Sequence, residues 1–250
     1  MSVFGLIGRS LGHSFSRSYF TDKFKRESLP GHRYELFELA EIGNLRDLIA
    51  STPGLRGLNV TIPYKQEVMP LLDVVDPLAA AVGAVNTIAI REGKLMGFNT
   101  DVEGFRDTLL PLLPGLIDPD SDIRLRALVL GSGGASRAVG YVLREQGIRF
   151  RVVSRSRERG DLSWDMLDPV SLKVCRLLIN TTPLGMHPDV GSLPPLPYAA
   201  IGPRHTLVDL VYNPPETQFL MFGMERGART VNGLQMLHAQ AEASWRLWNT

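Results

Sequence analysis

A short glycine-rich loop constrains the fold of this chain more than any other feature. The sequence predicts a buried strand at residues 127–130, a tight loop at 131–134 and a helix at 135–146. Glycines let a backbone approach a pyrophosphate closely, and the N-terminus of the following helix attracts that negative charge. This order of elements predicts a dinucleotide-binding α/β unit. Because Ser136 stands where the fingerprint usually has glycine or alanine, a plain strand-to-helix turn is the alternative.

The next predicted strand, residues 150–154, indicates which dinucleotide the loop binds. Sites for NAD usually place an acidic residue about 20 residues after the glycines, where it holds the ribose hydroxyls. Here the strand is followed by Arg155, Ser156 and Arg157, with Arg159 close behind. Guanidinium groups suit a 2′-phosphate, and serine hydroxyls add hydrogen bonds. The sequence therefore favours NADP, with a solvated basic turn as the alternative.

Strands and helices alternate along the rest of the chain. Strands are predicted at residues 3–8, 33–39, 58–62, 87–91, 95–98, 177–180 and 206–210, and helices at 16–27, 42–49, 63–72, 102–113 and 234–248. Such alternation is typical of α/β layers with parallel strands, and the turn at 92–94 predicts a hairpin. Proline, glycine and aspartate at 114–122 predict a linker between two domains.

Composition excludes several functional classes. The 250 residues include 44% hydrophobic residues, with 27 Lys and Arg against 26 Asp and Glu. This balance removes the electrostatic argument for a nucleic-acid or anionic-membrane partner. The single cysteine, Cys175, excludes an internal disulfide framework, and neither cysteine nor histidine spacing predicts a metal site. No targeting signal or membrane-spanning apolar stretch is found, so we expect a cytoplasmic protein.

Four side chains that follow predicted strands are candidates for substrate chemistry. An enzyme that transfers hydride from a dinucleotide to a carbonyl needs a proton donor near that carbonyl, because the product begins as an alkoxide. Lys65 lies on a predicted first helical turn, where the helix dipole is expected to lower its pKa, although a surface lysine is the alternative. Asp101 precedes a predicted helix and is alternatively an N-cap. Ser14 and Ser16 can bind a small carboxylate if the loop is extended, unless Ser16 caps the next helix.

Eight short motifs occur in a fixed order from end to end of the chain. They are HSFS at 13–16, NVTIPYK at 59–65, GAVNT at 83–87, NTD at 99–101, GSGGA at 131–135, NTTPLGM at 180–186, DLVYNP at 209–214 and GLQMLHAQ at 233–240. Together they resemble the shikimate dehydrogenase family. The ordered set is far more specific than any single motif.

The resemblance implies an enzyme that reversibly reduces 3-dehydroshikimate to shikimate with NADPH, on the route to chorismate and the aromatic amino acids. It implies an α/β protein of two domains with the active site in the cleft between them. Residues 1–101 with the C-terminal helix 233–250 are the expected substrate domain, and residues 102–232 the Rossmann-like NADP domain. The implied partners are small molecules, and the expected assembly is a monomer or homodimer. The alternatives are a quinate/shikimate dehydrogenase of this fold and a non-catalytic module that senses a dinucleotide or shikimate-like ligand.

The resemblance also implies roles for single residues. Lys65 and Asp101 match the catalytic pair, and Ser14 and Ser16 match the serines that hold the substrate carboxylate. The positions that contact the substrate ring are matched by Thr61, Asn86, Tyr212 and Gln240. The cofactor positions are matched by Gly131, Ser132, Gly133, Gly134, Ala135, Ser154, Arg155, Ser156 and Gly233, and a position near the nicotinamide is matched by Leu210.

This chain departs from the family pattern in several places, among them Asn232, which stands where aspartate often precedes the glycine matching Gly233, and a compact region between residues 156 and 176. Arg17 stands where proline usually follows the serines, and Phe20 and Thr21 replace the usual His-Asn pair. The turn at residues 154–156 has Ser-Arg-Ser where Asn-Arg-Thr is usual, which keeps the arginine. We therefore expect intact carboxylate serines in a loop of altered stiffness and charge.

Overall fold

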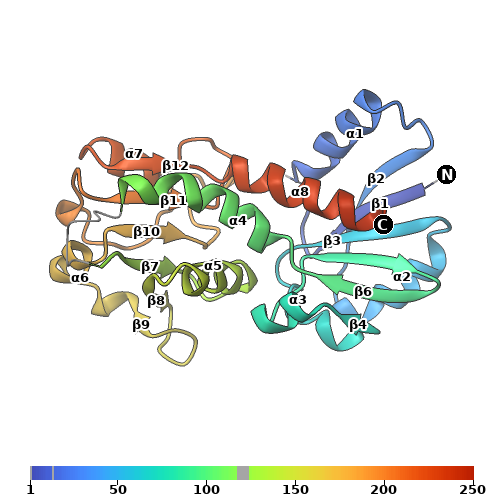
Figure 1. Ribbon diagram of the computed structural model, residues 1–250, viewed down its shortest axis with the longest axis horizontal. Coiled ribbons are helices and arrows are strands. Elements are labelled where there is room, and N and C mark those ends of the chain that lie inside the picture. The colour runs from blue at the N-terminus through green and yellow to red at the C-terminus, as the bar shows by residue number, and fades with distance from the viewer. Residues whose placement is uncertain (1, 13, 117–123) are drawn as a thin grey trace. The chain divides into compact units, whose positions relative to one another are not determined.

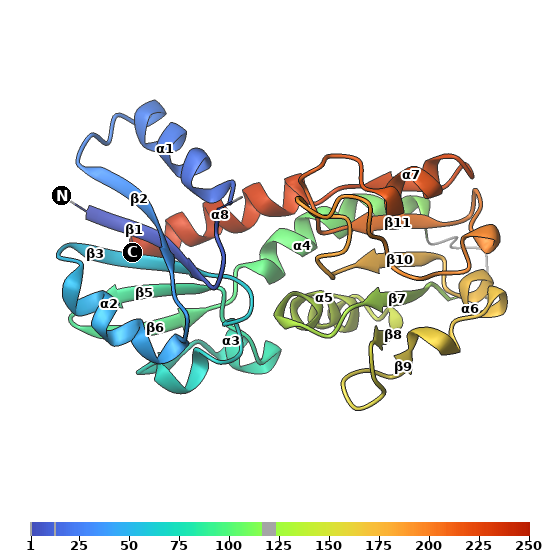
Figure 2. The ribbon, with the colours of Figure 1, turned by 180° about the vertical axis from the view of Figure 1, so that it is seen from behind.

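The computed structural model describes residues 2–12, 14–116 and 124–250. It divides into two compact units, Met1–Thr100 with Ala241–Thr250, and Asp101–Gln240 (Figures 1 and 2). The first boundary falls directly before α4 and the second falls inside α8. His13 of the first motif and residues 117–122 of the predicted linker lie outside the described residues.

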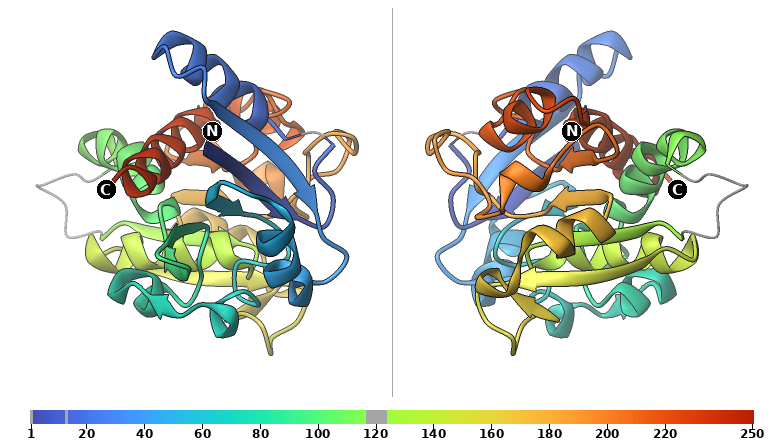
Figure 3. Two further views of the ribbon diagram at one scale, coloured as in Figure 1. Left: turned by 90° about the vertical axis from the view of Figure 1, so that its right-hand side faces the viewer. Right: turned by 90° about the vertical axis from the view of Figure 1, so that its left-hand side faces the viewer.

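The first unit contains a six-stranded mixed sheet in the order β2-β1-β3-β5-β6-β4. The strands are β1 (Ser2–Gly8), β2 (His32–Glu38), β3 (Leu55–Val60), β4 (Val74–Val75), β5 (Thr87–Arg91) and β6 (Lys94–Phe98). β1 pairs in parallel with β2 (Figure 3) and with β3, whereas β5 pairs antiparallel with β3 and β6. The predicted hairpin is confirmed, and Glu92 and Gly93 both adopt the positive φ that a tight two-residue turn requires.

Two apolar clusters pack against this sheet. Successive strand residues point to opposite faces, so β1 contributes Val3 and Ile7 to one cluster and Phe4 and Leu6 to the other. The helices of the unit are α1 (Ser16–Arg26), α2 (Leu45–Ser51), α3 (Pro77–Val82) and the C-terminal part of α8 (Leu234–Trp248). The second cluster is rich in aromatic rings and includes Trp248 of α8.

The helix predicted at residues 63–72 is wrong. Turns follow β3, and the only regular element there is the 3-10 helix η2 (Met69–Leu71). Pro70 has no N–H to donate to an i−4 carbonyl, which interrupts a helix at this point. Tyr64 is fully buried, and its hydroxyl donates to the Leu39 carbonyl at 2.5 Å. Lys65 therefore lies in a turn and not on the first turn of an α-helix, where a helix dipole would act on it.

The second unit contains a six-stranded parallel sheet in the order β12-β11-β10-β7-β8-β9. The strands are β7 (Arg126–Leu130), β8 (Arg149–Ser154), β9 (Leu162–Ser163), β10 (Leu177–Asn180), β11 (Thr206–Asp209) and β12 (Arg229–Val231). Counted from β7 as the first strand, this is the doubly wound 3-2-1-4-5-6 order of dinucleotide-binding sheets. The direction of winding reverses between β7 and β10, where such sheets bind their ligands.

The helices of this unit are α4 (Asp101–Leu109), α5 (Gly134–Glu145), α6 (Pro169–Val174), α7 (Gln218–Met224) and the first part of α8. The helix predicted at 102–113 is shorter than expected, because the chain continues as the 3-10 helix η3 (Leu110–Gly115). Pro111 and Pro114 lie within that stretch and oppose a continuous α-helix. Within the described residues, no helix has the length and hydropathy needed to cross a membrane.

Candidate functional site

Asn86 organises the polar residues of the first unit. Its side chain is 3% exposed; its Oδ1 accepts a hydrogen bond from the Thr100 N–H at 2.7 Å, and its Nδ2 donates to Thr100 Oγ1 at 2.9 Å. Asp101 is the next residue along the chain and the first residue of α4. The alternative that Asp101 is an N-cap is therefore wrong. A carboxylate in the first turn of a helix is favoured by the helix dipole.

Lys65 and Thr61 converge on the same part of the first unit. The Val85 N–H, directly before Asn86, donates to the Lys65 carbonyl at 2.7 Å. The Val60 N–H, directly before Thr61, donates to the Asn86 carbonyl at 2.8 Å. Lys65 and Thr61 are half-buried. The fold therefore brings the backbones of Thr61, Lys65 and Asn86 together, as a common role requires.

A cluster of buried hydroxyls supports Asn86, and sequence reasoning missed it. Thr87 Oγ1 lies 2.8 Å from Ser244 Oγ, and Thr100 Oγ1 lies 3.2 Å from each of them. Asn59 Nδ2 donates to Ser244 Oγ at 2.9 Å. Buried polar groups that are fully hydrogen-bonded rigidify their surroundings. The cluster joins β3, β5 and α8 to Thr100, the residue before Asp101.

The serine loop follows β1, but it is not extended as expected. Phe15 has helical backbone angles, and it, not Ser16, is the N-cap of α1. The alternative that Ser16 caps the helix is therefore wrong, because Ser16 is the first helical residue. The Ser16 N–H donates to Ser14 Oγ at 3.3 Å, and Glu38 Oε1 accepts from the Leu11 N–H at 2.7 Å. The first of these bonds, and not strand-like alternation, joins the two serines, and the second holds the start of the loop against the end of β2.

The glycine loop lies at the switch point of the parallel sheet. Gly131 has φ +112°, and a Cβ there would lie 2.6 Å from Thr181 Oγ1, so glycine is required. Gly133 is the N-cap of α5, so no side chain of the N-cap residue bonds to the first N–H groups of the helix. A Cβ built at Gly133 would lie in open space. Gly134 and the following residues Ala135 and Ser136 form the first turn of α5. Open space in front of uncapped helical N–H groups fits a pyrophosphate.

The missing fingerprint residue has a local explanation. The Ser136 hydroxyl donates to the Gly133 carbonyl at 2.6 Å, so the serine stabilises the loop while remaining buried. Ser132 lies between the loop glycines, half-buried. A serine at 136 is thus compatible with the tight turn that glycine or alanine usually allows.

The turn after β8 presents Arg155 to solvent. The buried Ser154 hydroxyl donates to the Ser156 carbonyl, and the Ser156 N–H donates to Ser154 Oγ at 3.2 Å. The Ser154 hydroxyl therefore shapes the turn. Arg155, Arg157 and Arg159 are all exposed. Three exposed guanidinium groups at this strand end fit the 2′-phosphate of NADP. An NAD site would have an acidic residue here to bind the ribose.

Leu210 and Gly233 pack closely in the second unit. The Gly233 N–H donates to the Val211 carbonyl at 3.0 Å, and a Cβ at Gly233 would lie 2.2 Å from the Leu210 carbonyl oxygen. The Leu210 N–H donates in turn to the Asn180 carbonyl at 2.9 Å. Glycine is thus needed for the start of α8 to approach the loop that carries Leu210 and the half-buried Tyr212.

Gln240 lies on α8 in the same unit. Its Nε2 donates to the Leu237 carbonyl at 2.9 Å, one turn earlier. A Cβ at Gly104 of α4 would lie 3.2 Å from Gln240 Cβ, so α4 and α8 are in close contact here. The side chain is half-buried. The glycine on α4 therefore makes room for the residue that the resemblance assigns to the substrate ring.

Asp209 is a second feature that sequence reasoning missed. Its carboxylate is fully buried and accepts three hydrogen bonds, from Asn180 Nδ2 and the Val211 N–H at 2.9 Å and from Thr217 Oγ1 at 2.6 Å. Burial raises the pKa of this carboxyl to about 6, although the bonds from Thr217, Val211 and Asn180 oppose the shift. An aspartate that ends a short, mostly apolar strand is the sequence signal that could have found it. The group ties three loops together.

No group of three or more His, Cys, Asp or Glu side chains in residues 2–12, 14–116 and 124–250 is placed to hold a metal ion. The side chains placed for chemistry in the described residues are the lysine, the carboxylates and the polar residues described above.

A parallel sheet in this order, with a glycine loop at its switch point and arginines after the second strand, defines a dinucleotide-binding α/β protein. Residues 6–88 of the other unit match the family described as the shikimate dehydrogenase substrate binding domain. A protein named shikimate dehydrogenase (NADP(+)) from Clostridium beijerinckii is 39% identical over 261 residues, 99% of this chain and 92% of that protein. The chain belongs to the shikimate dehydrogenase family.

Solved structures agree with this family. The shikimate 5-dehydrogenase of Thermus thermophilus, in complex with NADP(H) and shikimate, is 34% identical with a TM-score of 0.82, covering 99% of this chain and 93% of that one. The quinate dehydrogenase of Corynebacterium glutamicum, in complex with NAD, has the same TM-score and coverage at 27% identity. The fold is common to both activities, and the sequence is closer to the first.

Proposed function

We propose that this chain is an NADP-dependent shikimate dehydrogenase that interconverts 3-dehydroshikimate and shikimate. The 39% identity to the Clostridium beijerinckii protein, over 99% of this chain, supports the reaction. The observation that carries the assignment is the bonding of Asn86 to Thr100 and of Val85 to Lys65. These bonds fix, in one part of the first unit, the backbone that bears Lys65, Asn86 and the residue before Asp101.

Lys65 and Asp101 are the proposed catalytic pair. NADPH, when bound, supplies the hydride for reduction of the substrate carbonyl. The Lys65 ammonium stabilises the alkoxide that forms and donates a proton to its oxygen. The Asp101 carboxylate orients the ammonium, and the two groups act as a unit. In the direction of shikimate oxidation the same groups accept the hydroxyl proton.

The proposed binding residues divide between substrate and cofactor. Ser14 and Ser16 hold the substrate carboxylate, and the substrate ring is contacted by Thr61, Asn86, Tyr212 and Gln240. The proposed cofactor residues are Gly131, Ser132, Gly133, Gly134, Ala135, Ser154, Arg155, Ser156, Leu210 and Gly233. Residues 1–101 with 233–250 are the proposed substrate domain, and residues 102–232 the NADP domain. The match of residues 6–88 and the switch-point position of the glycine loop support this division.

A comparison of cofactors and substrates tests the proposal. The reduced nicotinamide absorbance is followed with shikimate or quinate, each with NADP⁺ or NAD⁺. The highest kcat/KM is expected for shikimate with NADP⁺. Faster turnover of quinate with NAD⁺ would identify a quinate/shikimate dehydrogenase instead. Dinucleotide binding without turnover of either substrate would identify a sensing module.

Replacing Arg155 by alanine is expected to weaken NADP⁺ binding and leave NAD⁺ use nearly unchanged. One charge-assisted bond to the 2′-phosphate is lost, which costs on the order of 1.5–3 kcal/mol. Dissociation constants for both cofactors, measured by titration calorimetry, give the effect. Arg149→Ala is the matched control, because Arg149 is also exposed but starts β8 whereas Arg155 follows its end. Equal losses for NADP⁺ and NAD⁺ would contradict a 2′-phosphate contact.

A further inference from the structure

Helix α1, which begins with Ser16, is held in place by few buried side chains. Of its eleven residues, only Phe20, Lys23 and Phe24 are buried. The two phenylalanines enter the aromatic cluster, where Phe20 stacks on Tyr34 at a centroid distance of 4.5 Å. The first turn lacks both a side-chain cap and an acidic residue. The start of α1 therefore depends on contacts from elsewhere in the unit.

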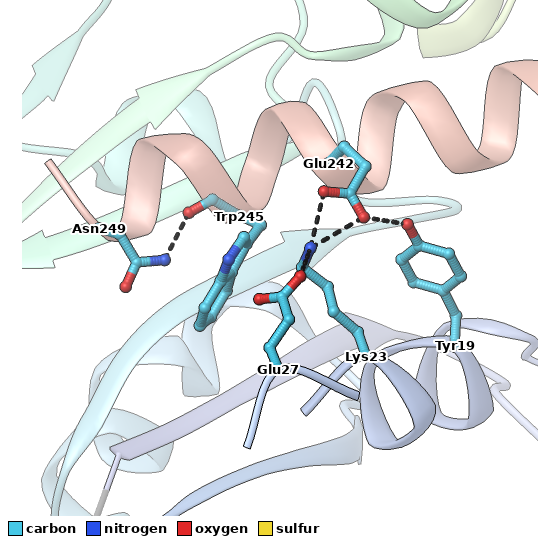
Figure 4. Close-up of polar contacts among 6 residues, drawn as sticks. All are labelled: Tyr19, Lys23, Glu27, Glu242, Trp245 and Asn249. Atoms are coloured by element: carbon cyan, nitrogen blue, oxygen red, sulfur yellow. Dashed lines mark hydrogen bonds and ion pairs between the residues drawn. The ribbon is translucent and has the colours of Figure 1, made fainter. Parts of the chain in front are cut away.

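Glu242 of α8 supplies the polar contact (Figure 4). Its two carboxylate oxygens accept hydrogen bonds from Lys23 Nζ at 3.0 and 2.7 Å, and Oε1 also accepts from the Tyr19 hydroxyl. Lys23 donates as well to Glu27 Oε1 at 2.5 Å, and its ammonium lies 5.7 Å from the Trp245 ring centroid. All five residues belong to the first unit.

The charges in this cluster make the contact specific. Lys23 is 4% exposed, and a buried ammonium is costly unless it is paired and hydrogen-bonded. Burial opposes ionisation of Glu242, but the bonds from Lys23 and Tyr19 outweigh it and hold the Glu242 pKa below its usual value. Burial and the bond to Glu242 hold the Tyr19 pKa above its usual range. Glu242 is thus ionised and bonded to two side chains of one helix.

The spacing of those side chains connects the cluster with the serine loop. Ser16, Tyr19 and Lys23 stand at positions i, i+3 and i+7 of α1, which places them on one face of the helix. Tyr19 is one turn from Ser16, whose N–H binds Ser14 Oγ. A contact that fixes Tyr19 therefore also holds the backbone of the first turn, which carries the Ser16 side chain and the N–H bonded to Ser14 Oγ.

We propose that Glu242 is a positioning residue for substrate binding, which holds the Ser14 and Ser16 hydroxyls in register for the substrate carboxylate through Tyr19 and Lys23. This inference rests on the proposed function, in which the two serines bind that carboxylate. Glu242 touches neither substrate nor cofactor in this role. Its effect is confined to the carboxylate end of the substrate.

The test compares shikimate with its carboxamide, which lacks the negative charge. Glu242→Ala is expected to raise the KM for shikimate about tenfold, the equivalent of one hydrogen bond to a charged group, with kcat and the KM for NADP⁺ unchanged. The KM for the carboxamide should change much less. Glu242→Gln keeps an acceptor for the Tyr19 hydroxyl and should restore part of the loss.

Glu27→Gln is the matched control. It removes the other carboxylate bonded to Lys23, but Glu27 lies at the C-terminal end of α1, eleven residues after Ser16. It should lower the melting temperature as a Glu242 variant does, without changing the ratio of the two KM values. If Glu242→Gln and Glu242→Ala behave like Glu27→Gln in that ratio, Glu242 has a structural role only and the inference is wrong.

The Ser14→Ala/Ser16→Ala variant separates this inference from the proposed function. If it leaves the preference for shikimate over the carboxamide intact, the serines do not bind the carboxylate and both proposals about this loop fail. If it removes the preference, adding Glu242→Gln should cause no further loss, because Glu242 acts only through the two serines. Additive losses would refute positioning. The Gln variant keeps this cycle available if Glu242→Ala does not fold.

Discussion

Replacing Lys65 by methionine is expected to lower kcat for shikimate oxidation by about 10²–10⁴-fold, the usual range for general acid–base catalysis. Methionine keeps much of the volume of the lysine stem and removes the charge. Because the Val85 N–H binds the Lys65 carbonyl and not its side chain, the loop should keep its backbone contacts. The KM for shikimate should therefore change little. Steady-state kinetics, with folding checked by circular dichroism, gives the result.

The partner variant tests whether Lys65 and Asp101 act together. Asp101→Asn should also lower kcat, and the double variant should lose much less than the product of the two single losses, since residues acting as a unit are not additive. Lys94→Met is the matched control, because Lys94 is an exposed lysine of the same unit at the β5–β6 turn. A folded Lys65→Met protein with near wild-type turnover would refute the proposed mechanism.

The elements that could be predicted from sequence are those with strong local signals. Strand β10 and helix α8 have the predicted bounds, residues 177–180 and 234–248. The first is a short run of apolar residues ending in a polar one, and the second has the length and periodicity of an amphipathic helix. The strand, glycine loop and helix at 126–145 were likewise predictable, because Gly131 must adopt a positive φ there.

The elements that were missed are short or depend on neighbours. β9 has two residues and β12 three, so neither carries a readable alternation. The segment 63–72 has helical composition, but its second proline and the buried Tyr64 favour turns. The prediction of an extended serine loop was wrong for a similar reason. The backbone at Phe15 already follows the helix, and nothing in the residues 14–16 alone states this.

The candidate site was predictable as a set of residues and not as a set of contacts. Motifs identified Lys65, Asn86 and Asp101, but only the fold shows that Thr100 is bound by Asn86. Lys23 would be placed on an exposed helix face from sequence, because lysines are rarely buried. It is buried because Glu242, 219 residues away, pairs with it. Contacts at such separations leave no local pattern.

Replacing Asp209 by alanine is expected to lower the free energy of unfolding by on the order of 3–5 kcal/mol, because each buried donor left without an acceptor costs about 1–3 kcal/mol. The donors are Asn180 Nδ2, the Val211 N–H and the Thr217 hydroxyl. Urea titration measures the loss. Asp168→Ala is the control, because that exposed aspartate only caps α6 and its loss should destabilise the protein much less. Equal losses would contradict the role of Asp209 in joining the three loops.

Asp209→Asn separates the charge of this group from its hydrogen bonds. The folded-state pKa, about 6, is above the ordinary value of 3.8, so the stabilising contribution of the protonated carboxyl is complete below about pH 4 and is lost as pH rises through 6. The free energy of unfolding falls by about 3 kcal/mol over this range, at about 1.4 kcal/mol per pKa unit. Asparagine is neutral throughout, keeps the Oδ1 acceptor for Asn180 and Val211, and can donate to Thr217 Oγ1. The difference in unfolding free energy between Asp209→Asn and wild type should therefore shift in favour of the variant between pH 4 and 7. Carboxyls such as Glu145, whose pKa is lowered by Arg106, are common to both proteins and cancel in that difference. A difference that stays constant with pH would show that Asp209 titrates normally in the folded protein.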